Sequence, residues 1–253
     1  MENRIRILGV PVDDVDMDEA VEKIEGLVRA GRPSYVVTPN VDHLMRLQRD
    51  PEFRRIYESS ACSLADGMPI LWAGKTLGTP LKAKVSGSDL FPNLCDKAAK
   101  MGHGVFFLGG REGAARKAAS VMRSRYPGLR VVGTYCPPMG FERDASENAK
   151  IVRMILNSGA DIVFVGLGSP KQEKWIDRFH SQYGASVSIG VGVTFEFVSG
   201  MVRRAPLWMQ RTGLEWCWRL LMEPGRLWKR YLVDDMAFFW LLLREKMAVR
   251  KPS

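Results

Sequence analysis

Asp66 is the residue of this sequence best placed to act as a general base. It follows a short run of small and apolar residues, 62–65, and comes just before Gly67 and Pro69. This pattern predicts a buried strand that ends at the carboxylate and turns into a helix. In open α/β sheets, ligands bind outside the carboxyl ends of the strands. Asp66 could instead cap the helix that Pro69 helps to start, and the stretch alone favours this second interpretation.

Polar side chains follow other predicted strands in the same way. Thr38 and Asn40 come at the end of a β-branched strand, where they offer a hydroxyl and an amide. Capping of the next helix would be a sufficient role for Asn40. Gln172 follows a later strand and would complete a capping box with Ser169 as the N-cap, although it could instead face a ligand at that helix end.

Backbone amides and one lysine could bind a phosphate group. Strand 104–108 leads into Gly109 and Gly110, and a helix follows at 114–125. Such a turn lets backbone N–H groups approach a phosphate at a helix N-terminus, although strand-to-helix turns use glycine for backbone reasons alone. Lys84 adds positive charge in a loop that leads to another helix, which Ser88 or Asp89 could cap.

Alternating strand and helix patterns must position these residues. Apolar or β-branched runs predict strands near residues 5–10, 34–38, 104–108, 130–135, 161–168 and 187–193. Helical spacing predicts helices near residues 18–30, 41–49, 70–73, 114–125 and 144–158. This order predicts an α/β fold, a Rossmann-like and largely parallel sheet flanked by helices. We expect a catalytic core over 1–200, in two α/β halves of about 1–100 and 101–200, and a helical appendage over 201–253.

The appendage is expected to be basic and rich in tryptophan. It holds eleven Lys and Arg against five Asp and Glu, and five of the seven tryptophans of the chain. Helical pieces are predicted near 205–223 and 226–246, and the second contains the apolar run 236–243. Basic residues interleaved with Trp suit an anionic membrane surface, although a solvated helix face packed on the core remains the alternative. The apolar run could also pack on a second copy of the chain, so a homo-oligomer is a further alternative.

Composition narrows the remaining classes of function. The first residues lack the apolar run of a signal peptide. The sequence contains no run of about 18 apolar residues, the length that could span a bilayer. The four cysteines are scattered singly, which favours a reducing cytoplasmic compartment over zinc or disulfides. Asp14, Asp16 and Asp18 alternate like a metal site, but acids are common where a helix starts. The sequence lacks the full glycine motif of a dinucleotide-dependent oxidoreductase, which argues against that class of enzyme. The positions of the tryptophans argue against nucleic-acid binding.

Several motifs together resemble one family of bacterial enzymes, the WecG/TagA/CpsF glycosyltransferases. They occur in order over most of the chain: Thr38-Pro39-Asn40, Ala65-Asp66-Gly67-Met68-Pro69, Val85-Ser86-Gly87-Ser88-Asp89-Leu90, Gly166-Leu167-Gly168-Ser169-Pro170-Lys171-Gln172-Glu173, and Arg204-Ala205-Pro206 with Trp208 and Gln210. The resemblance implies transfer of N-acetylmannosamine, or a related sugar, from a UDP-sugar. The implied acceptor is polyprenyl-diphosphate-linked N-acetylglucosamine, in teichoic acid or polysaccharide biosynthesis on the inner face of the cell membrane.

The resemblance also implies roles for individual residues. Asp66 resembles the catalytic base of the family, and the substrate-site residues correspond to Thr38, Asn40 and Gln172. Arg219 and Arg226 fall where the appendage supplies arginines that close over the site. Three positions in two motifs depart from the usual pattern of the family: Lys84 stands in place of arginine, and Val193 and Glu196 stand in place of glycine and aspartate. These departures put the identity of the nucleotide sugar in question, so a different UDP-hexose or uronic acid donor remains the alternative.

The expected reaction needs one base and a way to stabilise the departing UDP. We expect Asp66 to take the proton of the acceptor hydroxyl. Helix N-termini and basic side chains can stabilise the leaving diphosphate, so we expect no cofactor and no metal requirement. Candidates are Lys84, Gly109, Gly110, Gln172, Arg219 and Arg226.

Overall fold

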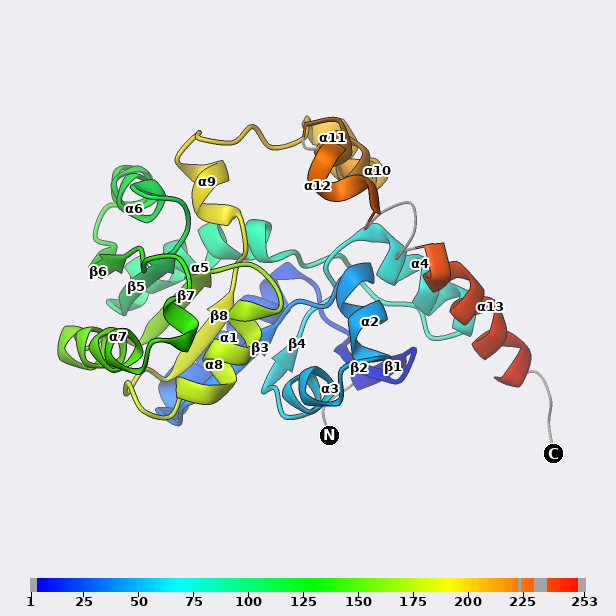
Figure 1. The fold of residues 1–253 in the computed structure, drawn as a ribbon, viewed down its shortest axis with the longest axis horizontal. Helices are drawn as coiled ribbons and strands as arrows, with labels where there is room; N and C mark the ends of the chain where they lie inside the picture. Colours follow the sequence, from blue (N-terminus) through cyan, green and yellow to red (C-terminus); the bar gives the residue numbers. More distant parts are fainter. Residues whose placement is uncertain (1–3, 223, 230–235, 250–253) are drawn as a thin grey trace.

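One parallel sheet forms the centre of the chain. The computed structural model describes residues 4–222, 224–229 and 236–249. Within them, six strands pair in the order β4-β3-β8-β7-β5-β6, and every pairing is parallel (Figure 1). The strands are β3 (Ser34–Val37), β4 (Cys62–Ser63), β5 (Gly104–Gly109), β6 (Arg130–Tyr135), β7 (Ile162–Gly166) and β8 (Val187–Gly190). The predicted α/β fold is confirmed, and strands from both predicted halves join in one sheet.

Strand side chains alternate between two apolar layers, which is why helices cover both faces. In β5, Val105 and Phe107 pack in one cluster, whereas Phe106 and Leu108 pack in the other. The first cluster includes residues of α1 (Met17–Ala30), α5 (Gly87–Met101), α6 (Ala114–Arg125) and α9 (Thr194–Val198). The second includes residues of α2 (Val41–Leu47), α3 (Pro51–Glu58), α4 (Met68–Leu77), α7 (Ala145–Ser158) and α8 (Lys171–Phe179), and the short helix η1 (Phe141–Arg143).

Local capping chemistry sets the start of α1. Asp16 caps α1 in a reciprocal capping box with Glu19. Asp14 accepts the backbone N–H of Lys82 at 2.8 Å. The alternating aspartates therefore belong to a helix start, and the described residues contain no cluster of three or more potential metal ligands.

Three local predictions were wrong. Residues 5–10 do not form a strand of the main sheet, because Leu8 and Gly9 turn the chain between antiparallel strands β1 (Arg4–Ile7) and β2 (Val10–Asp13). Helix α5 is capped by Ser86 and starts two residues earlier than a cap at Ser88 would allow. Ser169 is not the N-cap of α8, since Pro170 takes that position and makes no side-chain cap bond.

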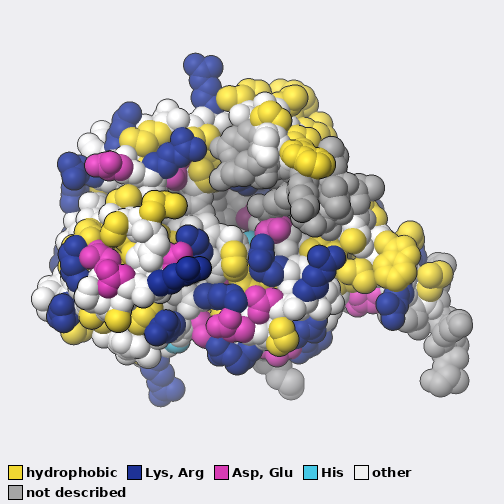
Figure 2. All heavy atoms as spheres, in the orientation of Figure 1, with side chains coloured by type: hydrophobic (Ala, Val, Ile, Leu, Met, Phe, Trp, Pro, Cys, Tyr) yellow, Lys and Arg dark blue, Asp and Glu magenta, His cyan; other side chains and the backbone are white. Residues whose placement is uncertain are grey.

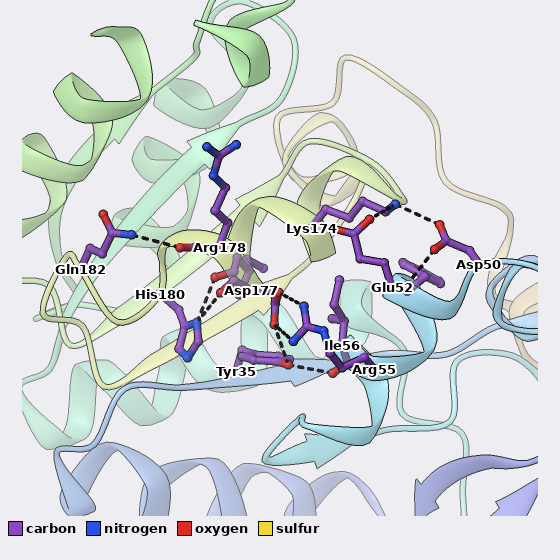
Figure 3. Close-up of polar contacts among 12 residues, drawn as sticks. Tyr35, Asp50, Glu52, Arg55, Ile56, Lys174, Asp177, Arg178, His180 and Gln182 are labelled. Atoms are coloured by element: carbon purple, nitrogen blue, oxygen red, sulfur yellow. Dashed lines mark hydrogen bonds and ion pairs between the residues drawn. The ribbon is translucent and has the colours of Figure 1, made fainter. Parts of the chain in front are cut away.

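Ion pairs join helix α8 to helix α3 on one side of the sheet (Figure 3). Arg55 Nη2 lies 2.5 Å from Asp177 Oδ2, and Lys174 Nζ lies 3.0 Å from Asp50 Oδ2 and 2.6 Å from Glu52 Oε2. These contacts fix α8 beside α3, and therefore fix the helix whose first turn carries Gln172.

The C-terminal segment is helical but more divided than the sequence predicts. It contains α10 (Leu207–Thr212), α11 (Glu215–Met222), α12 (Pro224–Lys229) and α13 (Met236–Val249). Gly213 ends α10 with a φ of 77°, so the predicted helix 205–223 is two helices. Residues 230–235, in the second predicted helix, lie outside the described residues. Helix α13 lies beside α4 and α2 (Figure 1), and no described helix has the length and apolar character needed to span a membrane.

Candidate active site

Asp66 lies just beyond the carboxyl end of β4, and it does not cap the next helix. Its backbone N–H donates to the Pro39 carbonyl at 2.9 Å, and Val85 N–H donates to the Ala65 carbonyl at 2.8 Å. The N-cap of α4 is Gly67, with a φ of 109° and no side-chain cap bond. The capping interpretation was therefore wrong, and the partly buried carboxylate of Asp66 is left available for chemistry.

The surroundings of Asp66 raise the pKa of its carboxyl group to near neutral pH. Burial and the nearby carboxylates of Glu215 and Asp89 raise its pKa to about 7, against the opposing charges of Lys84 and Arg219. An unperturbed aspartate is a weak base because its pKa is about 3.9. A carboxylate that titrates near neutrality is matched to proton transfer at physiological pH.

A cavity is lined by Lys84 and Asp89, whose charges act on Asp66, although Asp66 itself is not one of its lining residues. Its volume is about 330 Å³, within the usual range for small-molecule sites. Core residues and α10 together form its walls, which are lined by Met68, Lys84, Asp89, Leu207 and Gln210. Asp66 lies two residues before Met68, and the charge of Lys84 acts on it. The site therefore has walls from both the α/β core and the C-terminal segment.

A chain of ion pairs borders the cavity. Lys84 Nζ lies 3.4 Å from Asp89 Oδ2, which also accepts the Ser86 hydroxyl at 2.6 Å. Arg204 Nη1 lies 2.6 Å from Asp89 Oδ1, and its Nε lies 3.1 Å from Glu215 Oε1. Burial would raise the pKa of Asp89, but hydrogen bonds from Arg204 and Ser86 hold it below its usual value. Asp89 is therefore ionised and holds Lys84 at the wall.

Thr38, Asn40 and Gln172 all follow the carboxyl ends of sheet strands: Thr38 comes directly after β3, Asn40 is the N-cap of α2, and Gln172 lies in the first turn of α8, after β7. Thr38 is buried, and a Cβ placed on Gly87 would lie 3.7 Å from its hydroxyl oxygen. Asn40 caps α2 by accepting the His43 N–H at 3.1 Å, so the capping interpretation is confirmed. Gln172 accepts the Gly192 N–H at 3.0 Å, which ties α8 to the end of β8 and leaves the predicted capping box unformed.

Internal contacts account for the two glycines at the end of β5, Gly109 and Gly110. A Cβ on Gly109 would lie 2.6 Å from the Gly166 carbonyl oxygen, and that oxygen accepts the Gly110 N–H at 2.7 Å. The next N–H, of Arg111, donates to Glu196 Oε1 at 2.9 Å. Close packing of β5 on β7 thus requires glycine here, and phosphate binding at this turn stays a prediction.

The C-terminal arginines are only partly described. Arg219 lies on α11 beside a small cavity of about 20 Å³, and its positive charge reaches Asp66. Arg226 belongs to α12, but its side chain lies outside the described residues. Buried polar atoms that lack a hydrogen-bond partner among the described residues include Ser169 Oγ, Glu173 Oε2, Glu196 Oε2 and Arg204 Nη2.

Sequence reasoning missed the charged residues that surround Asp66. Asp89 was considered only as a helix cap and as part of a motif, and Arg204 only as part of a motif. Glu215 carried no signal at all, because it lies far along the chain in a helix with an ordinary pattern. A search for charges near the predicted base needs the folded chain.

The fold and the site define the chain as a glycosyltransferase once they are set beside known proteins. Its residues 5–252 match the "Glycosyl transferase WecG/TagA/CpsF family". The chain belongs to this family. Two relatives are named N-acetylglucosaminyldiphosphoundecaprenol N-acetyl-beta-D-mannosaminyltransferase. The one from Bacillus spizizenii is 32% identical over 87% of this chain and 82% of its own length. The one from Staphylococcus aureus strain MW2 is 28% identical over 98% and 95%.

Proposed function

We propose that this glycosyltransferase moves N-acetylmannosamine from a UDP-sugar to a polyprenyl-diphosphate-linked N-acetylglucosamine, with inversion at the anomeric carbon. The names of its relatives support this acceptor and this sugar. The observation that carries the proposal is a carboxylate with a pKa of about 7 on which the charges of Lys84 and Asp89 act, two residues that line a cavity of about 330 Å³. Family membership removes the oxidoreductase alternative.

The reaction assigns Asp66 as the base. Its carboxylate takes the proton of the acceptor hydroxyl while that oxygen bonds to the anomeric carbon. The bond from that carbon to the β-phosphate oxygen breaks on the opposite face, and UDP leaves with the electron pair. Lys84, Arg219 and Arg226 are proposed to stabilise the charge of the leaving diphosphate.

The remaining site residues are proposed to hold the two substrates. Thr38 follows β3 and Gln172 lies in the first turn of α8, and both are proposed to contact substrate. Asn40 keeps an amide nitrogen that the helix cap does not use. Gly109 and Gly110 are proposed to approach a phosphate through the backbone. Since basic side chains can carry the leaving-group charge, we expect EDTA to leave turnover unchanged.

Exposed apolar residues of the C-terminal helices support peripheral binding to the inner face of the cell membrane. Figure 2 shows hydrophobic side chains gathered over α10–α12 and over α13. They include Leu207, Trp208, Leu221, Met222, Trp228, Phe239, Trp240, Leu243 and Met247. Residues 201–253 are therefore proposed to form a membrane-associating appendage that brings the site to a lipid-linked acceptor.

Ligand binding and turnover together test this function. UDP should raise the melting temperature of the protein, whereas NAD and duplex DNA should not. Asp66→Asn should keep the UDP effect and lose turnover by about 10²-fold or more, because only the base is removed. Near-normal turnover in Asp66→Asn would exclude this base.

The donor is tested with a panel of UDP-sugars and a short-chain polyprenyl-diphosphate acceptor. UDP-N-acetylmannosamine should give the highest kcat/KM. A preference for another UDP-hexose or for a UDP-uronic acid would favour the alternative raised by Lys84 and Glu196. Lys84 is a point charge where an arginine would form a bidentate clamp, so this residue is one place where donor preference could change.

A further inference from the structure

Arg204 joins the α/β core to the C-terminal helices through two ion pairs. It lies between α9 and α10, and its guanidinium contacts Asp89 at the start of α5 and Glu215 at the start of α11. Its side chain is only 21% exposed, and the two carboxylates are 30% and 26% exposed. Ion pairs that are largely shielded from solvent are screened less by salt than surface pairs.

We propose that Arg204 is a positioning residue that couples docking of the C-terminal helices to the charge environment of Asp66. It does so by holding Glu215 against the core while it neutralises both Glu215 and Asp89. The inference rests on the proposed role of Asp66 as the base.

The first support is the shape of the site. Asp89 binds Arg204 through one oxygen and Ser86 and Lys84 through the other. Both Asp89 and Lys84 line the cavity, whose other wall is α10. Arg204 therefore connects the Lys84–Asp89 ion pair, which forms one wall of the cavity, to the C-terminal segment, which forms the other wall.

The second support is the set of charges that face Asp66. Glu215 and Asp89 raise its pKa, whereas Lys84 and Arg219 lower it. The buried hydroxyl of Tyr57, on α3, also senses the charge of Asp66. Two of these groups, Glu215 and Arg219, lie on α11, so Asp66 has this environment only when α11 is docked.

The third support is the shape of the guanidinium group. Arginine presents several donors in a planar fork, so it can bind two carboxylates at once, whereas lysine offers a single charge centre. Arg204 uses Nη1 for Asp89 and Nε for Glu215. A lysine at this position would keep the charge but lose one of the two contacts.

Docking is tested by proteolysis of the whole protein without substrate. Arg204→Gln should be cut by chymotrypsin at Trp208, Trp216 and Trp218 about tenfold faster than the wild type, since the two ion pairs that hold α11 are lost. Arg204→Lys should give an intermediate rate. Arg55→Gln is the matched control, because it removes an ion pair between α3 and α8, away from the cavity, and should keep the wild-type rate.

The charge effect is tested by the pH dependence of turnover. The acidic limb of kcat/KM should lie near pH 7 in the wild type. In Glu215→Gln it should move to lower pH by about half a unit or more, because one carboxylate facing Asp66 is gone. A purely structural role for Glu215 would lower kcat at all pH values and leave the limb in place.

Two results would overturn the inference. One is a wild-type cleavage rate in Arg204→Gln, and the other is an unmoved acidic limb in Glu215→Gln. The proteolysis needs no substrate, so a failure of the proposed reaction would not affect that measurement. The titration of Asp66 can also be followed without substrate, as the pH above which the stabilisation by Asp66→Asn stops growing, and this pH should fall in the Glu215→Gln background.

Discussion

Asp66 shows how a folded chain changes the chemistry of an ordinary side chain. Burial costs the carboxylate its hydration, and two neighbouring acids add repulsion, so its pKa lies near 7. This arrangement lowers the stability of the folded protein when Asp66 is ionised. An aspartate whose pKa is higher in the folded protein than in the unfolded chain favours folding most when it is protonated.

This linkage predicts a stabilising substitution at the site. The contribution of Asp66 to the free energy of unfolding is full below about pH 4 and is lost as the pH rises toward 7. Asp66→Asn should therefore be more stable than the wild type at pH values above about 7. We expect a gain on the order of 2 kcal/mol at pH 8 and little difference at pH 4. Urea unfolding at both pH values measures it. A gain of equal size at both would mean that Asp66 does not titrate in this range.

Polar residues next to helix starts were the least predictable from their patterns. The expected cap at Asn40 formed, whereas the equally regular pattern at Ser169 and Gln172 did not. The difference is that Gln172 has a tertiary partner, the N–H of Gly192, which competes with the local bond. A capping pattern therefore predicts a helix start more reliably than it predicts what the side chain binds.

Helix α10 meets α4 at a contact that only glycine permits. Gly213 has a φ of 77°, and a Cβ there would lie 2.7 Å from the Cβ of Met68, two residues from Asp66. The C-terminal helices are thus packed directly against the turn that carries the proposed base.

We expect Gly213→Ala to loosen this contact. It should destabilise the protein by about 1–3 kcal/mol and lower turnover, because both the left-handed backbone and the close approach are disturbed. Gly200→Ala is the matched control, since Gly200 has a φ of 72° and a Cβ added there would have nothing within 4 Å. Denaturant unfolding of the two variants separates backbone strain from the contact. Equal losses would show that the contact with Met68 contributes nothing.

The long apolar run of α13 forms two faces of the helix, one buried and one exposed. Phe238 and Leu242 are buried in the core cluster, whereas Phe239, Trp240 and Leu243 are about half exposed or more. One face therefore docks the helix on the core, and the other is free to enter a membrane interface. Two apolar faces also explain why the run looks continuous in the sequence.

This division predicts which residues bind lipid. Trp240→Ser should lower binding to vesicles containing anionic phosphatidylglycerol by about tenfold and leave the melting temperature unchanged, because an exposed side chain adds little to folding. Added salt should weaken binding of the wild type. Met139→Ser, at a 95% exposed position outside the appendage, is the control. Unchanged binding in Trp240→Ser would remove this face of α13 from the membrane contact.

Local sequence patterns were enough to specify the parallel α/β fold, most helix starts, the strand ends after which Asp66 and Thr38 lie and the helix start that holds Gln172. Those features follow from periodicity and backbone chemistry, which neighbouring residues set. Long-range packing set the rest: the partner of Gln172 and the charges around Asp66. Electrostatic interactions act through space, so the acidity of Asp66 depends on Glu215 and Arg219, which reach it only when α11 packs on the core.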